Sequence, residues 1–220
     1  MALLKIAAMG NPVLRARAQE VADPTQPAIH ALIRDMAETM ADAGGVGLAA
    51  PQVHVPLRIV LFRLPPARLA AGDGAAGGDG AEEPPEDEGE GGEDLGPLHV
   101  LINPVVVPVG DEMALGWEGC LSVPRMRGVV PRHTQIRYRG VGPDGTPVQG
   151  EARGFHARVI QHECDHLDGI LYPMRITDLR LFGFNDELDR HPIVLGGDEE
   201  TEEKAEAAAT ADAPAPGGER

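Results

Sequence analysis

The chain has 220 residues and a formal net charge of −16, and this length suits one domain with a sizeable core. No apolar run is long enough to span a membrane, the N-terminus lacks the regions of a secretory signal, and no basic patch or nucleic-acid motif stands out. The two cysteines suit a reducing compartment rather than a disulfide framework, and an organellar transit peptide is the less favoured interpretation of the N-terminus.

The negative charge is concentrated in two segments. Residues 72–97 contain ten acidic residues and no Lys or Arg, and residues 198–220 contain eight acidic residues and two basic ones, so the rest of the chain is neutral. Because these segments have few apolar side chains, they cannot bury enough surface to offset the entropy of ordering. We therefore predict one domain over residues 1–195 with a disordered acidic insert at 72–97, and a disordered acidic tail over 196–220.

The N-terminal part of that domain is expected to contain a strand, a turn and a helix. Apolar residues between positions 3 and 6 indicate a strand, and residues 10–12 form a Gly-Asn-Pro turn. Apolar residues then recur at the spacing of one helix face: Ile29, Leu32, Ile33, Met36 and Met40. Gly44 and Gly45 end this helix.

Strands and a second helix follow. Residues 57–62 and 98–109 are rich in branched side chains, as strands are. Residues 129–139 and 146–152 flank a Gly-Pro-Asp-Gly turn and predict a hairpin. Residues 154–167 form the second helix, which a glycine and then a proline stop. The order predicts an α+β domain with mostly antiparallel sheets.

The second helix contains the sequence His162-Glu163-Cys164-Asp165-His166. Residues four apart share one helix face, so both imidazoles can reach one metal ion, and Glu163 projects beside them, where it can move a proton. The alternative is a helix with two surface histidines and nearby charges. This HExxH pattern alone supports the two interpretations about equally.

A third ligand has three candidates. The first is the third histidine of one family of HExxH proteases, but Tyr172 stands where that pattern needs it, so the pattern is incomplete here. Glu187 matches a carboxylate ligand on a later helix, although it lies among other acidic residues. Cys120, in the run Glu-Gly-Cys-Leu-Ser, supplies a thiolate, which is a strong ligand for zinc or iron.

Residues 45–52 read Gly-Val-Gly-Leu-Ala-Ala-Pro-Gln. Small residues after a helix let the backbone approach a ligand closely, and Gln52 then supplies an amide donor. The alternative is a plain connection between helix and strand. The run is not a phosphate loop, because it lacks the Lys-Ser/Thr ending.

Together, GVGLAAPQ, EGCLS and QHECDH resemble, in this order and at these separations, the three signature motifs of peptide deformylase. The resemblance runs from about Leu4 to Leu195 and includes GNPVLR, the VPR at residues 130–132 and HLDGILY. The run GFHARVIQHE is similar to the organellar and proteobacterial branch. Two departures are the long insert at 72–97 and the acidic tail, since some members use a basic C-terminal helix on the ribosome.

The resemblance implies a deformylase-like catalytic domain, with antiparallel sheets packed around the HExxH helix, that removes the N-formyl group from the N-terminal methionine of newly made proteins and releases formate. It implies one divalent metal ion per chain, typically Fe(II), with Zn or Ni also able to bind, on Cys120, His162 and His166. It also implies a bacterial cytoplasmic location, nascent formyl-methionyl peptides as substrate and transient ribosome contact. From the sequence itself we expect no membrane partner and no direct nucleic-acid partner.

The resemblance also implies roles around the metal. Glu163 would take a proton from water and deliver it to the leaving amine. Gln52 and the backbone N–H of Leu121 would hold the oxyanion. Val46 and Gly47 would line the substrate strand, with Val46 beside the methionine side chain.

Two alternatives remain. One is a zinc endopeptidase with Glu187 as its third ligand. The other is a deformylase-like binding protein without activity, which the intact Glu163, Gln52 and Cys120 argue against.

Overall fold

The computed structural model of the chain describes residues 2–64, 96–193 and 195. Residues 72–95 of the predicted acidic insert and the whole predicted tail, 196–220, lie outside the described residues. The division of the chain into a domain, an insert and a tail therefore stays a prediction.

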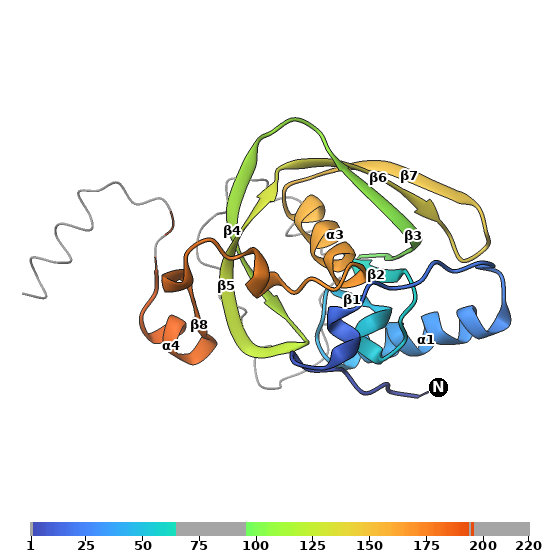
Figure 1. Cartoon of the computed structure of the whole chain (residues 1–220), viewed down its shortest axis with the longest axis horizontal. Helices are drawn as coiled ribbons and strands as arrows, with labels where there is room; N and C mark the ends of the chain where they lie inside the picture. Colours follow the sequence, from blue (N-terminus) through green and yellow to red (C-terminus); the bar gives the residue numbers. More distant parts are fainter. Residues whose placement is uncertain (1, 65–95, 194, 196–220) are drawn as a thin grey trace, which may run out of the picture.

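Two antiparallel sheets surround helix α3 (Gly154–Leu167), which lies near the centre of the molecule (Figure 1). The five-stranded sheet has the order β1-β2-β3-β6-β7, and its strands are β1 (Gly47–Ala49), β2 (Ile59–Arg63), β3 (Leu98–Pro108), β6 (Gln135–Val141) and β7 (Pro147–Arg153). The three-stranded sheet has the order β4-β5-β8, with strands β4 (Met113–Cys120), β5 (Val123–His133) and β8 (Phe182–Phe184). This arrangement confirms the expected α+β class.

Helix α1 (Pro27–Asp42) covers part of the five-stranded sheet, and its spacing of apolar residues explains why. Ile29, Ile33, Met36 and Met40 are buried in one cluster with residues of β1 and β2. The helix ends as predicted, since Gly44 adopts a φ of +64°, which favours glycine. The shorter helices are η1 (Pro12–Arg15), η2 (Ala50–Val53), η4 (Tyr172–Arg175), η5 (Leu179–Leu181) and α4 (Asn185–Arg190).

Three predictions of secondary structure were wrong or incomplete. The strand expected over 129–139 is two strands in different sheets, because the chain turns at Thr134, which no glycine or proline marks. Strand β4, the partner of β5, was not predicted. Residues 3–6 form no strand; instead, the Leu4 N–H donates to Thr39 Oγ1 (2.9 Å) and the Ala7 N–H donates to the Gln52 carbonyl (2.7 Å).

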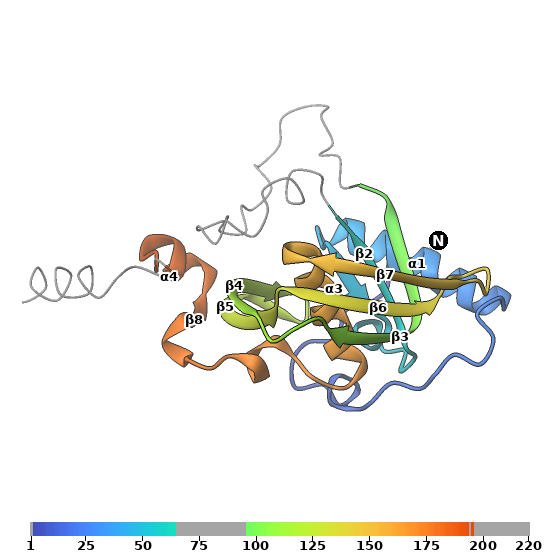
Figure 2. The same ribbon diagram turned by 90° about the horizontal axis from the view of Figure 1, so that it is seen from above.

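Helix α3 has two chemically different sides, and this difference positions the site. Its apolar side packs against the five-stranded sheet, in a buried cluster that includes Ala157, Ile160, Cys164 and Leu167 of the helix and Val60, Phe62, Leu101 and Ile136 of the strands. Seen from above, β3, β6 and β7 run alongside one another near this helix (Figure 2). Its polar side faces β4 and β5, because His162 contacts Glu118 of β4 and Asp165 accepts a hydrogen bond from Arg132 of β5.

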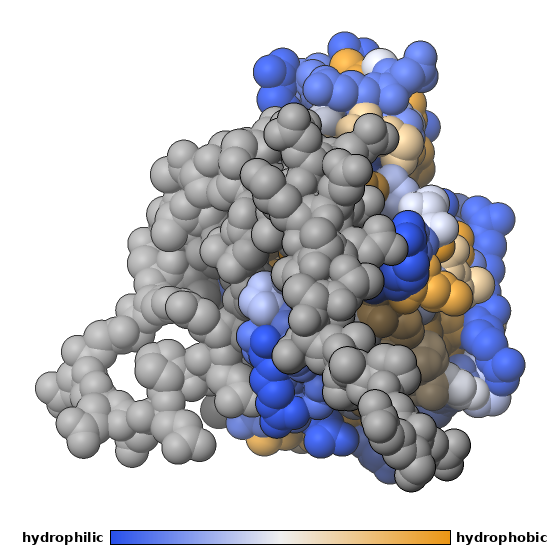
Figure 3. All heavy atoms as spheres, turned by 90° about the vertical axis from the view of Figure 1, so that its left-hand side faces the viewer, coloured by the Kyte–Doolittle hydropathy of each residue, from blue (hydrophilic) through white to orange (hydrophobic). Residues whose placement is uncertain are grey.

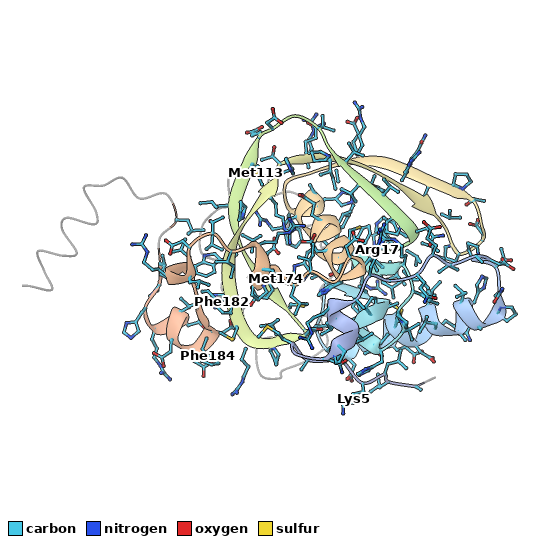
Figure 4. The ribbon with its side chains drawn as sticks, viewed as in Figure 1. Lys5, Arg17, Met113, Met174, Phe182 and Phe184 are labelled. Atoms are coloured by element: carbon cyan, nitrogen blue, oxygen red, sulfur yellow. The ribbon has the colours of Figure 1, made fainter. Side chains whose placement is uncertain are left out.

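The surface of the described residues is mixed. On the face in Figure 3, hydrophobic areas are bordered by hydrophilic side chains. Large exposed apolar side chains occur on several elements, including Met113 of β4 and Phe184 of β8, which Figure 4 labels. Among the described residues, no helix is long and apolar enough to cross a membrane.

Candidate metal centre

Three potential metal ligands converge between β4 and α3. Cys120 is the last residue of β4, and His162 and His166 lie one turn apart on α3. One ligand atom from each residue lies within 4.8 Å of the other two, and Cys120 Sγ is 3.3 Å from His166 Nε2. Ligands of a tetrahedral metal ion, bound at about 2.0–2.3 Å, lie at comparable separations. The three side chains thus fit one ion.

The orientation of His162 also fits a metal ligand. Its Nδ1 lies 2.8 Å from Glu118 Oε2, so its other ring nitrogen, Nε2, is available for the ion. A carboxylate behind the ligating histidine is the usual partner, because it fixes the ring and its tautomer. The ring of Tyr172 stacks on the His162 ring, with a centroid distance of 6.1 Å and an interplanar angle of 22°.

The two histidines differ in charge preference. Burial lowers the pKa of His162, but hydrogen bonds with Cys120 and Glu118 raise it well above its ordinary value. Burial lowers the pKa of His166 well below its ordinary value, so this imidazole is held neutral. A neutral imidazole is the form that binds a metal. Burial thus already favours the ligating form of His166, whereas the contacts of His162 with Cys120 and Glu118 favour its protonated form.

Glu118 is the centre of a buried charge network. Burial would raise the pKa of its carboxyl, but hydrogen bonds from His162 and Arg132 hold it well below its ordinary value. Arg132 donates from Nε and Nη2 to the two Glu118 oxygens, at 2.9 and 3.0 Å, and also donates to Asp165. Arg175 donates to the same Asp165 at 2.6 Å. These residues connect β4, β5 and α3 beside the ligands.

Glu163 lies against the first signature segment. A Cβ on Gly47 would overlap Glu163 Oε1, so β1 can approach the carboxylate only with glycine at this position. Burial raises the pKa of Glu163 to about 7, although the neighbouring His162 lowers it. Its Oε2 atom is buried and makes no hydrogen bond with any described residue.

Gln52, in η2, is oriented by its own segment. Its Oε1 accepts a hydrogen bond from the Ala49 N–H at 2.8 Å. Its Nε2 therefore points the other way and donates to Ser122 Oγ at 3.2 Å and towards Cys120 Sγ at 3.5 Å. The amide N–H group faces the metal ligands.

The remaining predicted site residues lie close by. Leu121 follows Cys120. A Cβ on Gly45 would lie 2.9 Å from Leu121 Cδ1, so the GVGLAAPQ motif and the EGCLS motif are in contact. Val46 is partly buried, and its carbonyl accepts a hydrogen bond from the Arg63 N–H at 2.8 Å. Strand β1, which begins at Gly47, is at the edge of the five-stranded sheet.

The other two positions considered for a third ligand, residues 172 and 187, supply none in the structure. The Tyr172 hydroxyl donates to the Met126 carbonyl at 3.0 Å, not towards the histidines. Glu187 is on α4, is exposed and pairs with Arg190 at 2.7 Å. Sequence reasoning did not give roles to Glu118, Arg132 or Asp165, although each lies in or next to a motif that it singled out.

Comparisons with known proteins agree with this geometry. The family model described as polypeptide deformylase matches residues 3–181. The chain is 47% identical over 180 residues to peptide deformylase 1 of Nitrosomonas europaea, covering 82% of this chain and 91% of the relative. It is 44% identical over 194 residues to peptide deformylase 1 of Prochlorococcus marinus, covering 88% and 91%.

Solved structures are similar over most of the chain. A class I type b peptide deformylase from Acinetobacter baumannii, crystallised with bound Met-Ala-Ser, has a TM-score of 0.63 and 31% identity, covering 80% of this chain and 99% of that one. A peptide deformylase from Synechococcus elongatus in complex with actinonin has a TM-score of 0.64 and 30% identity, covering 87% of each chain. The chain therefore belongs to the polypeptide deformylase family, the hydrolases that remove the formyl group from an N-terminal methionine.

Proposed function

We propose that deformylation takes place at a metal ion held by Cys120, His162 and His166, and that Glu163 moves the proton. The convergence of the three ligand atoms within 4.8 Å of one another, beside a buried carboxylate, supports this proposal. The bound ion supplies a Lewis acid that activates the hydrolytic water and polarises the formyl carbonyl. We propose Fe(II) as this ion, with Zn or Ni as alternatives, since thiolate and imidazole suit all three.

Glu163 has the position and the basicity for proton transfer. Its buried Oε2 has no partner among the described residues, so it is free to accept a proton from the attacking water. The water oxygen forms a bond to the formyl carbon, and the C–N bond breaks. Glu163 then gives the proton to the leaving amine, which yields formate and a free N-terminal methionine. In the metal-free chain, burial raises the pKa of this carboxyl to about 7, and a basicity in this range suits a group that accepts and returns one proton.

Two donors are proposed to hold the oxygen that becomes negative. Gln52 Nε2 faces the ligands because its Oε1 is bound by the Ala49 N–H. The backbone N–H of Leu121 is the second donor, next to Cys120 in the chain. Removal of one such donor typically costs about 2.7–4 kcal/mol of transition-state stabilisation.

The substrate peptide is proposed to lie along the edge strand β1. Because β1 is the last strand of its sheet, its outer edge can pair with an extended peptide. Gly47 and Val46 would line that peptide, with Val46 beside the methionine side chain. The substrate is the N-terminus of a newly made protein, so we also propose transient ribosome contact in the cytoplasm of a bacterium.

Metal retention and formate release together test this proposal. Cys120→Ala should abolish tight metal binding, whereas Glu187→Ala should retain about one ion per chain and release formate from a formyl-Met peptide at the wild-type rate. Protein purified anaerobically preserves Fe(II), and elemental analysis identifies the ion. If Cys120→Ala kept its metal and Glu187→Ala lost it, the proposed ligand set would be wrong.

A further inference from the structure

Arg158 is a buried charge that the proposed chemistry does not use. It lies on α3, one turn before His162, and 14% of its side chain is exposed. A guanidinium is always charged in proteins, and a charge is rarely buried without several partners. Its contacts therefore indicate what it does.

The Arg158 guanidinium connects α3 to both strands of the β4–β5 hairpin. Its Nη1 donates to Glu118 Oε1 at 2.9 Å and to the Val130 carbonyl at 2.8 Å, and lies 3.4 Å from the Gly116 carbonyl. Its Nη2 donates to the Ala114 carbonyl at 2.8 Å. One planar group thus fixes the spacing of two strands and one carboxylate.

Gly116 makes room for this group. A Cβ on Gly116 would lie 2.8 Å from Cζ and 2.8 Å from Nη2 of Arg158. Glycine in the interior of a strand weakens the strand and often marks a close approach by another group. The guanidinium of Arg158 is that group, so Gly116 and Arg158 act as a pair.

Glu118 carries the effect of this pair to the ligand. Its Oε1 accepts hydrogen bonds from Arg132 and Arg158, and its Oε2 accepts from Arg132 and lies 2.8 Å from His162 Nδ1. Arg132 also pairs with Asp165 of α3, so it is shared between two carboxylates. Without Arg158, Glu118 would lose a hydrogen-bond donor on α3, the helix that also carries His162.

We propose that Arg158 is a positioning residue for the metal centre. Its guanidinium packs against Gly116 and holds the Glu118 carboxylate in place, and this carboxylate in turn fixes the orientation of the His162 ring. This inference rests on the proposed role of His162 as a ligand. It assigns no contact between Arg158 and the substrate. Arg158 should therefore affect the geometry and retention of the ion, and leave substrate binding unchanged.

Metal release measures this effect directly. Replacing the partner behind a ligating histidine typically costs 10–100-fold in metal affinity or activity. Arg158 contacts that partner, Glu118, rather than the histidine itself, and Arg132 still holds Glu118 when Arg158 is replaced. We therefore expect the low end of this range: Arg158→Met should release its ion to a chelator about 10-fold faster than the wild type. The visible spectrum of Co(II)-substituted protein should shift, because it reports ligand geometry, and KM should stay at the wild-type value. Arg137→Met is the matched control, since Arg137 is an exposed arginine of β6 with 69% of its side chain accessible.

Gly116→Ala provides an independent arm. Its Cβ displaces the guanidinium, so it should speed metal release in the wild-type background and add little in the Arg158→Met background. Wild-type release from Gly116→Ala, or full additivity of the two substitutions, would overturn the proposal. If Arg158→Met did not fold, the rate of metal release from Gly116→Ala alone would test the proposal. Failure of the proposed ligand set is distinguishable, because it would appear as metal retention by Cys120→Ala.

Discussion

Gly47 lies so close to Glu163 that any side chain at position 47 would overlap the Glu163 carboxylate. The glycine of the first signature segment therefore sets the position of the proposed proton carrier. Gly47→Ala should push the carboxylate away from the reacting atoms, and a misplacement of about 1 Å can cost about 100-fold in rate. We expect kcat for formate release to fall by about that factor while metal content stays near one ion per chain.

Gly183→Ala is the control for this substitution. A Cβ on Gly183 would make ordinary contacts with Leu188, at 3.4 Å or more, and Gly183 lies in β8 rather than at the metal centre. Its kcat should match the wild type. Normal turnover of Gly47→Ala would show that the carboxylate does not need its present position.

Glu163→Gln and Gln52→Ala should both lower kcat, for different reasons. Glutamine retains the size of the side chain but cannot accept the proton of water, and general acid–base catalysis typically contributes about 10²–10⁴-fold. Gln52→Ala removes a donor to the oxyanion and leaves proton transfer intact. Turnover should be compared with metal content in each variant. Near-normal turnover by metal-loaded Glu163→Gln would mean that another group moves the proton.

The acidic insert should be dispensable, and the structure shows why a short linker can replace it. The chain leaves the described residues at Leu64 and returns at Gly96, whose carbonyl accepts a hydrogen bond from Arg63 Nη1 at 2.9 Å. Leu64 and Gly96, the described residues on either side, lie close together, so a short Gly/Ser linker in place of the predicted insert, residues 72–97, should close the chain without strain. The thermal midpoint and formate release should stay close to wild type. A large loss of either would show that the insert packs or participates.

Helix α3, which carries the two candidate metal-binding histidines, could be predicted from the sequence because its signals are local. Its apolar residues repeat at helical spacing, and His162 and His166 are four residues apart, so the fold of α3 alone brings them together. Cys120 is different: it is 42 residues from His162, and only its resemblance to a known motif identified it as the partner of the two histidines.

The buried charge network could not be predicted because its contacts depend on strand pairing. Gly116 is 42 residues from Arg158, and only the pairing of β4 with β5 brings Gly116, Val130 and Glu118 to one guanidinium. Strand β4 was missed, and β5 was expected to run on into β6. The sequence showed an arginine one turn before His162 and gave no sign of its partners.

The stability of the metal-free protein should depend on pH through Glu163. The ordinary pKa of this group is 4.5 and burial raises it to about 7, so the folded state binds the proton more tightly than the unfolded state. The resulting stabilisation is fully present below pH 4.5 and is lost as the pH rises through 7. One pKa unit corresponds to about 1.4 kcal/mol, so the full loss is roughly 3 kcal/mol.

Glu163→Gln removes this titration, because an amide stays neutral. In urea unfolding with a chelator present, the variant and the wild type should differ little near pH 4, and the variant should become more stable than the wild type as the pH rises towards 8, by up to roughly 3 kcal/mol. Glu187→Gln, at an exposed carboxylate of α4, should follow the wild type throughout. If Glu163→Gln and wild type gave parallel curves over this range, the Glu163 carboxyl would not be held in its protonated form by burial, and its proposed basicity near neutral pH would lose its support.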